Sequence, residues 1–243
     1  MFSISKGGYK HKKEFTHTMY DFWALSWLFH SLLFVRTMYE VVHLHLRSHP
    51  QYNGLPLHRK FYVQKNIVKS GILCCLFFFA SITILPNILY HDHWNSYLIH
   101  RLAALYGAND ILGLLIVDKL PRSTQIHHQV SALFVLCAFS LDFQVSSVAQ
   151  ALFVYTFASA SAYIVNGHLA IRLFAPPSIV KRTRLISSIV YACSCSLCWC
   201  WHIWWWGMVE KSMVHIAYIF LLCWIVRDDI ILMRWLCTST SKE

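Results

Sequence analysis

Charged residues are scarce in this chain of 243 residues: aspartate, glutamate, lysine and arginine together make up 13% of it, whereas 57% is hydrophobic. Soluble domains carry about 25% charged and about 45–50% apolar residues. A disordered chain, a coiled coil and an ordinary cytosolic enzyme all need a more polar composition than this one. The shortage of charge therefore excludes these three classes and favours a membrane protein.

Acidic residues are the scarcer of the charged groups, with 11 against 21 lysines and arginines, and the formal net charge is +10. A basic balance is typical of nucleic-acid binding. Basic loops that flank apolar spans also set the orientation of membrane proteins. Because the basic residues here lie between apolar runs, we interpret them as loop charges and expect no nucleic-acid partner.

Apolar runs near twenty residues, the length of a helix that crosses a bilayer, occur six times. We expect spans over 68–90, 97–117, 126–143, 148–172, 185–207 and 214–236. A seventh run, 20–45, is interrupted by His30, Arg36 and Glu40, the last two spaced to pair on one helix face. We predict that it spans, with an interfacial position as the alternative.

The sequence thus predicts an all-α fold, a multi-pass transmembrane helical bundle of six to seven spans. We expect a basic N-terminal tail over 1–19, one membrane domain over 20–236 and a short C-terminal tail over 237–243. No small-residue cleavage site follows the first apolar run, so we expect no cleavable signal peptide.

Lysines and arginines predict the orientation of the bundle. With seven spans, thirteen of them fall on the side of the C-terminus, including Lys65 and Lys69, and six fall on the other side. We therefore expect a cytosolic C-terminus. If the first run does not cross, the N-terminal tail joins the cytosolic side and the count becomes seventeen against two.

Several chemistries lack the residues that they need. The last run, 214–236, holds no lysine for a retinal Schiff base, and Thr124 stands where a di-iron HxxHH box ending at His128 needs its first histidine. Cysteines of the sixth run lie at spacings unlike those of zinc loops, so we read them as small packing residues: Cys193, Cys195, Cys198 and Cys200. We interpret the tryptophans that follow as an interfacial belt.

Polar residues inside the predicted spans lie at similar depth. Asp110, Asn166, His168 and Asp229 fall within about seven residues of the expected cytosolic ends of their runs, and His127 with His128 opens another run on that side. Arg227 and Asp228 adjoin Asp229. Ionisable residues in hydrocarbon are costly and usually face a cavity, so the layer predicts a pocket open to the cytosolic leaflet. Interfacial histidines and a structural ion pair are the alternative.

Two stretches resemble a known family. Tyr106-Gly107-Ala108-Asn109-Asp110-Ile111-Leu112 is followed, after a short basic loop, by Ile126-His127-His128-Gln129-Val130-Ser131-Ala132-Leu133. This pattern, with the later Asn166 and Arg172, resembles the TLC-domain family, which includes ceramide synthases and translocating-chain-associated membrane proteins. The resemblance covers residues 60–236. It implies a role in membrane lipid metabolism, with membrane lipids as partners, in the endoplasmic reticulum or a related endomembrane.

For ceramide-synthase-like acyl transfer, the resemblance implies acyl-CoA as co-substrate and no bound cofactor or metal. His127 or His128 would be the general base or acyl acceptor, and Asp110 would orient the imidazole. The expected substrate-binding residues are Asn109, Asn166, His168, Arg227, Asp228 and Asp229. The acids that ceramide synthases carry further on are missing from 154–158, which favours a non-catalytic lipid-binding protein as the alternative. A seven-helix receptor or transporter is a remote one.

Overall fold

Helices make up almost the whole computed structural model, which describes the backbone of residues 7–238 and the side chains of residues 23–238. No strand occurs in that part of the chain, so the predicted all-α fold is confirmed. The helices are α1 (Gly7–Leu46), α2 (Pro50–Asn53), α3 (Leu57–Thr83), α4 (Leu85–His91), α5 (Ser96–Ile116), α6 (Arg122–Ala138), α7 (Ser147–Ser161), α8 (Tyr163–Ile171), α9 (Pro177–Met208) and α10 (Met213–Thr238).

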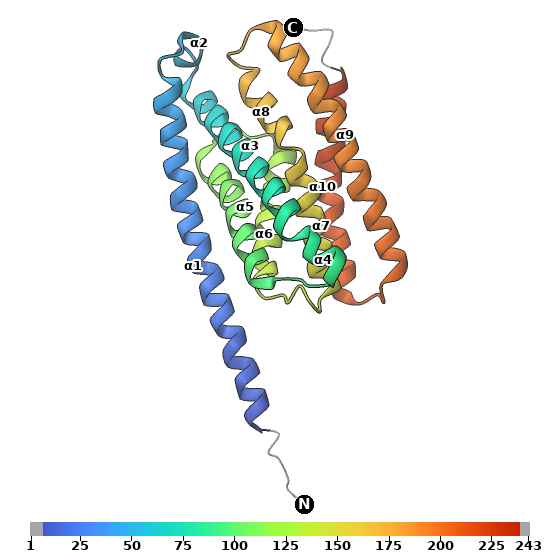
Figure 1. The fold of residues 1–243 in the computed structure, drawn as a ribbon. Coiled ribbons are helices and arrows are strands. Elements are labelled where there is room, and N and C mark those ends of the chain that lie inside the picture. The colour runs from blue at the N-terminus through green and yellow to red at the C-terminus, as the bar shows by residue number, and fades with distance from the viewer. Residues whose placement is uncertain (1–6, 239–243) are drawn as a thin grey trace, which may run out of the picture.

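The helices after α2 form a closed ring, and α1 lies outside it (Figure 1). Around the ring α3 packs on α5, α5 on α6, α6 on α10 and α10 on α9. Helix α9 packs on α7 and α8, and both of these return to α3. Helix α1 packs against α5 and α3 and extends past the end of the bundle where α4 lies. The ring encloses the space in which the polar residues lie.

Every proline of the chain stands at the start of a helix. Proline has no backbone N–H to donate and its φ angle suits a first turn, so helix starts tolerate it. The six prolines precede or open five helices: Pro50 in α2, Pro56 before α3, Pro86 in α4, Pro121 before α6, and Pro176 with Pro177 at α9. The prolines thus define where five of the helices begin.

Two predicted spans are interrupted in the structure. The run over 148–172 consists of α7 and α8, which meet at a bend of 42°. Next to the bend the Ser161 hydroxyl donates to the carbonyl of Ala158 at 2.6 Å, a side-chain bond that competes with the helix ladder and bends it. The run over 68–90 breaks at Ile84, two residues before Pro86.

Fewer helices than predicted pass a test of length and apolarity for crossing a membrane. Among the described residues, Leu57–His91 and Pro177–Met208 are long and apolar enough, and the bent pair α7–α8 adds a third if it acts as one span. Helix α6 has 17 residues, short of the about 20 that a bilayer needs. Helix α10 is long enough, but it carries Arg227, Asp228 and Asp229. A bundle of six to seven spans is therefore not established by helix length and composition.

The ends of the described chain differ from the predicted tails. Helix α1 begins at Gly7, inside the stretch predicted as a basic tail, and residues 1–6 lie outside the described part. At the other end α10 continues to Thr238, one residue into the predicted C-terminal tail. The predicted pair on α1 is present, with the Arg36 guanidinium 2.5 Å from the Glu40 carboxylate.

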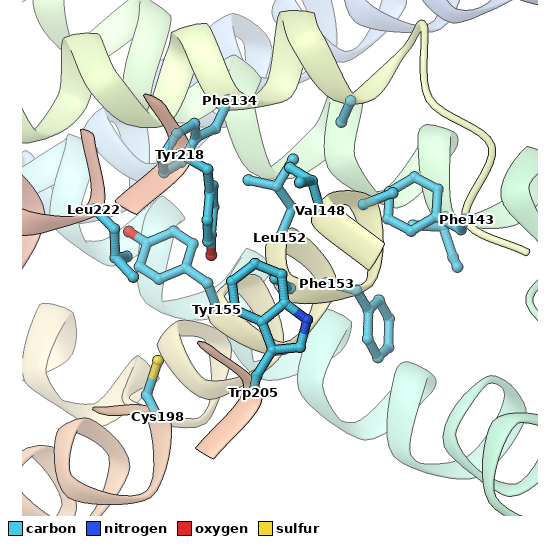
Figure 2. Packing of buried hydrophobic residues seen from close by; sticks show 14 of the residues in the cluster. Phe134, Phe143, Val148, Leu152, Phe153, Tyr155, Cys198, Trp205, Tyr218 and Leu222 are labelled. Atoms are coloured by element: carbon cyan, nitrogen blue, oxygen red, sulfur yellow. The ribbon is translucent and has the colours of Figure 1, made fainter. Parts of the chain in front are cut away.

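An aromatic core fills the end of the ring where α6 and α9 end and α7 and α10 begin, and Figure 2 shows how its side chains pack. The ring centroids of Phe134 and Tyr218 lie 5.3 Å apart, and those of Trp205 and Tyr218 lie 5.8 Å apart. Between this core and α5 remains an apolar cavity of about 60 Å³ lined by Phe134, Ala160 and Tyr155, among others. This end of the ring is nearly filled by side chains.

Candidate functional site

A larger cavity of about 330 Å³ lies inside the ring, lined by residues from α3, α6, α7, α8, α9 and α10. Tyr155 of α7 lines both this cavity and the apolar one. The polar lining residues come mainly from the N-terminal halves of α3 and α6, from α8 and the residue after it, and from the C-terminal half of α10, which lie toward the same end of the bundle (Figure 1). The predicted gathering of polar groups at one depth therefore corresponds to one cavity.

A chain of four buried side chains connects α3, α5 and α6 beside this cavity. Lys69 donates to Oδ1 of Asp110 at 2.5 Å, and Nδ1 of His128 lies 3.0 Å from the same oxygen. Nζ of Lys65 lies 2.6 Å from Nε2 of His128. When the proton is on Nδ1, facing the carboxylate, Nε2 accepts a hydrogen bond from Lys65. Both ring nitrogens of His128 are therefore engaged by protein groups.

The burial of this chain is nearly complete, with residue exposures of 0% for Asp110, 2% for Lys65 and 6% for Lys69. Buried charges are tolerated when they are paired and hydrogen-bonded, and Asp110 supplies the counter-charge. A glycine makes room for Lys65: a Cβ at position 113 of α5 would lie 2.6 Å from Lys65 Cε. Gly113 therefore allows the lysine to reach His128.

A second imidazole meets carboxylates on the other side of the cavity. Nδ1 of His127 lies 3.3 Å from Asp228 and 4.0 Å from Asp229, both on α10. The Tyr191 hydroxyl of α9 donates to Asp229 at 2.7 Å, which fixes that carboxylate. His127 lines the cavity and its Nδ1 faces the carboxylates, and a ring that carries its proton on Nδ1 has a lone pair on Nε2. Such a pair can take up a proton from a bound group.

Arg172, just after α8, lies at the outer end of the cavity. Its guanidinium is 4.5 Å from the centroid of the Trp235 ring, a cation–π distance. Tyr62 and Asn66 of α3 and Asn166 of α8 line the cavity with it. These groups can bind an anionic or hydrogen-bonding headgroup.

The structure brings together most of the residues that the sequence singled out. His127, His128, Asn166, Asp228 and Asp229 line the larger cavity. Asp110 is not in the cavity wall and lies directly behind His128. Of the two histidines that Asp110 was expected to orient, it contacts only His128. Asp228 lies beside His127 in the corresponding position.

Three expected residues lie elsewhere. Asn109 accepts a hydrogen bond from the Tyr39 hydroxyl at 3.0 Å, which fastens α1 to α5. His168 meets the Thr183 hydroxyl of α9 at 3.0 Å and does not line the cavity. Arg227 lines a neighbouring hollow of about 300 Å³ with Arg122 and Trp224, and this hollow shares Ser123 and Asp228 with the wall of the larger cavity. A position on a helix alone does not reveal which of its faces meets a neighbour.

Sequence reasoning missed the two lysines of the site. Lys65 and Lys69 were assigned to the loop charges that set orientation, yet both are buried in α3. Their spacing of four residues at the start of an apolar run places them on one face of a helix. That spacing, opposite an aspartate in another apolar run, was the available signal.

Comparisons with known proteins do not assign a function, so the function is argued from the site. No protein-family model, no curated protein and no solved structure matches this chain.

Proposed function

We propose that this chain is a multi-pass membrane protein of TLC-domain type, with six to seven spans, that acts on membrane lipids by acyl-CoA-dependent acyl transfer. The resemblance around Asp110 and His127-His128 supports the family. Large apolar side chains on the outer surface support the membrane position, for example Leu197 and Ile203 on α9, which are more than 70% exposed. The endoplasmic reticulum, or a related endomembrane, with a cytosolic C-terminus is the location that we propose.

The observation that carries this proposal is the charged cavity that adjoins an apolar one inside the ring. Ligand sites are concave and combine apolar lining with a few placed polar groups. Tyr155 lies in the walls of both cavities, so a headgroup in the larger one can direct its chain toward the smaller one. An amphiphile matches this division of the interior.

In the proposed reaction His127 is the general base. An acceptor amine or hydroxyl attacks the thioester carbonyl of acyl-CoA, and Nε2 of His127 takes its proton while Asp228 stabilises the imidazolium at Nδ1. The C–S bond then breaks, and the CoA thiolate takes the proton back from His127. The products are the acylated lipid and free CoA, and the histidine is neutral again.

The test uses the purified full chain in lipid nanodiscs with labelled acyl-CoA and a panel of sphingoid bases and lysolipids. We expect a labelled lipid product and one equivalent of free CoA. His127→Gln should lower the rate by about 10²–10⁴-fold, the usual contribution of a general base. The matched control His93→Gln, at an exposed loop position, should keep the full rate. An absence of turnover with every acceptor would remove the enzymatic proposal.

A non-catalytic lipid-binding protein is the second candidate, and one observation favours it. Nε2 of His128 lies 2.6 Å from Lys65 and Nδ1 lies 3.0 Å from Asp110, so both nitrogens face protein groups, as in a structural network rather than a free base. Native mass spectrometry separates the two proposals. Co-purified lipid that persists unchanged after addition of acyl-CoA supports binding alone, whereas its conversion supports transfer.

A further inference from the structure

The larger cavity carries charges of both signs that are not paired with one another. Among the described residues, no carboxylate lies within 4.0 Å of the amine of Lys65 or the guanidinium of Arg172. In the same part of the chain, no lysine or arginine lies within that distance of Asp228 or Asp229. All four line the cavity.

These groups form two separate walls. Lys65 and Arg172 belong to α3 and the end of α8, which pack against each other. Asp228 and Asp229 belong to α10, where they meet His127 of α6. Helix α10 packs on α6 and α9, across the ring from α3. The cavity therefore has a cationic side and an acidic side.

Unpaired charges in a protein interior are expensive, and a ligand that supplies the opposite charges relieves this cost. A purely anionic ligand would pair with the cationic side and leave the carboxylates unmatched. A simple amine would do the reverse, and a neutral lipid would pair with neither side. Only a ligand that carries both charges satisfies both walls.

Resting on the proposed lipid function, we propose that the cavity recognises a lipid whose headgroup carries both a phosphate and a primary ammonium. The phosphate binds Lys65 and Arg172, because guanidinium and ammonium groups are the usual phosphate partners. The ammonium binds Asp228 and Asp229. A cavity of about 330 Å³ is at the lower end of the usual range for ligand sites, which suits a headgroup.

Placement of the ammonium at the acidic side also brings it to His127. Nδ1 of His127 is 3.3 Å from Asp228, so an amine bound by this carboxylate lies beside the imidazole. The bound ammonium becomes a nucleophilic amine when it loses one proton to water, and His127 takes the second proton as the amine attacks the thioester. The same binding mode therefore presents the amine for acylation if the protein is an acyltransferase.

The experiment measures binding of defined lipids to the full chain in detergent micelles, without acyl-CoA, so that it does not depend on turnover. Two probes carry both charges on different backbones: lysophosphatidylethanolamine and sphingosine 1-phosphate. Lysophosphatidic acid carries the phosphate alone, and sphingosine carries the amine alone. We expect at least one of the first two probes to bind tenfold or more tightly than either single-charge probe, and the preferred backbone identifies the source of the headgroup.

Two variants test which charged group of the lipid each wall binds. Arg172→Gln should weaken the binding of lysophosphatidic acid by about tenfold and leave the binding of sphingosine unchanged. The isosteric Asp229→Asn should weaken the binding of sphingosine and leave that of lysophosphatidic acid unchanged. Arg182→Gln and Asp118→Asn, at exposed positions, are matched controls that should change neither affinity. Thermal unfolding of each variant checks that it folds.

The outcomes separate this inference from the proposed function. Equal binding of single-charge and double-charge lipids would overturn the inference and leave lipid binding intact. A preference for the double-charge lipids without acyl transfer would support it and remove the catalytic proposal. If none of the lipids binds, both fall.

Discussion

The two cavities inside the ring differ in the polarity of their walls. The smaller one, about 60 Å³, is bounded by aromatic and aliphatic side chains that pack closely, whereas the wall of the larger, about 330 Å³, combines lysine, arginine, histidine and aspartate with apolar side chains such as Leu222 and Trp235. Helices α3, α6 and α7 line both, and Tyr155 belongs to both walls. At the apolar end the side chains nearly fill the space between the helices. At the charged end the lysine and arginine are not paired with the aspartates, and a larger cavity remains between them. The difference indicates that the ring is stabilised at its apolar end and binds at its charged end.

The largest expected effect comes from the buried ion pair at the charged end. Asp110→Asn keeps the shape of the side chain but leaves the Lys69 ammonium without its counter-charge. Breaking such a pair costs about 3–5 kcal/mol. Denaturant titration of the purified protein should show this loss in the free energy of unfolding.

The exposed pair on α1 provides the control for Asp110→Asn. Glu40→Gln removes a pair whose side chains are 46% and 52% exposed, and exposed pairs contribute about 0.2–1 kcal/mol. Equal losses in the two variants would contradict a special role for the buried pair.

A smaller effect is expected at Gly113, where the absence of a side chain makes room for Lys65. Gly113→Ala places a methyl group 2.6 Å from Lys65 Cε, so the lysine must leave its position at His128. We expect about tenfold weaker binding of lysophosphatidic acid, or about 1.4 kcal/mol. Gly71→Ala in α3 has nothing within 4 Å of the added carbon and should bind normally. Unchanged binding in both variants would show that Lys65 does not contact the ligand.

The apolar end should respond in stability and not in binding. The Tyr218 hydroxyl and Nε2 of His202 are 2.8 Å apart in the aromatic core. Tyr218→Phe removes this bond, which typically costs about 1 kcal/mol, and should leave lipid affinity unchanged. Tyr90→Phe, at an exposed position, is the control for the unfolding measurement. A change in headgroup affinity would mean that the two ends are coupled.

The smallest expected effect tests whether the apolar cavity receives a lipid chain. Ala160→Val adds two methyl carbons to its wall, and filling such a void typically stabilises by about 0.5–1 kcal/mol. If a chain enters there, the variant should bind long-chain lysolipids several-fold more weakly and short-chain ones equally well. Parallel loss for both chain lengths would place the chain elsewhere.

The long apolar runs of the sequence located most helices but not their faces. The runs over 97–117 and 214–236 match α5 and α10 within about two residues, because long apolar segments determine helices locally. The break between α7 and α8 was not predictable in this way, because it lies inside one continuous apolar run.

The candidate site was predictable as a layer and not as a set of contacts. Helical rise alone placed Asp110, His127 and Asp229 at one depth. That Lys65 is buried, whereas most lysines in loops are not, follows from partners on α5 and α6 and from the missing side chain at Gly113. Such long-range contacts leave no mark in the periodicity of one segment.

The ring also determines where the two ends of the described chain lie. An even number of passes, with α7 and α8 counted as one, returns the chain to the end of the bundle where it entered, so Leu57 and Thr238 lie at the same end (Figure 1). Helix α1 adds one further pass of 40 residues, about 60 Å at 1.5 Å per residue. Spectroscopic labels placed near Gly7 and Thr238 would therefore lie at opposite ends of the molecule. Without α1 the chain would begin and end at the same end of the bundle, and the ring would still be closed.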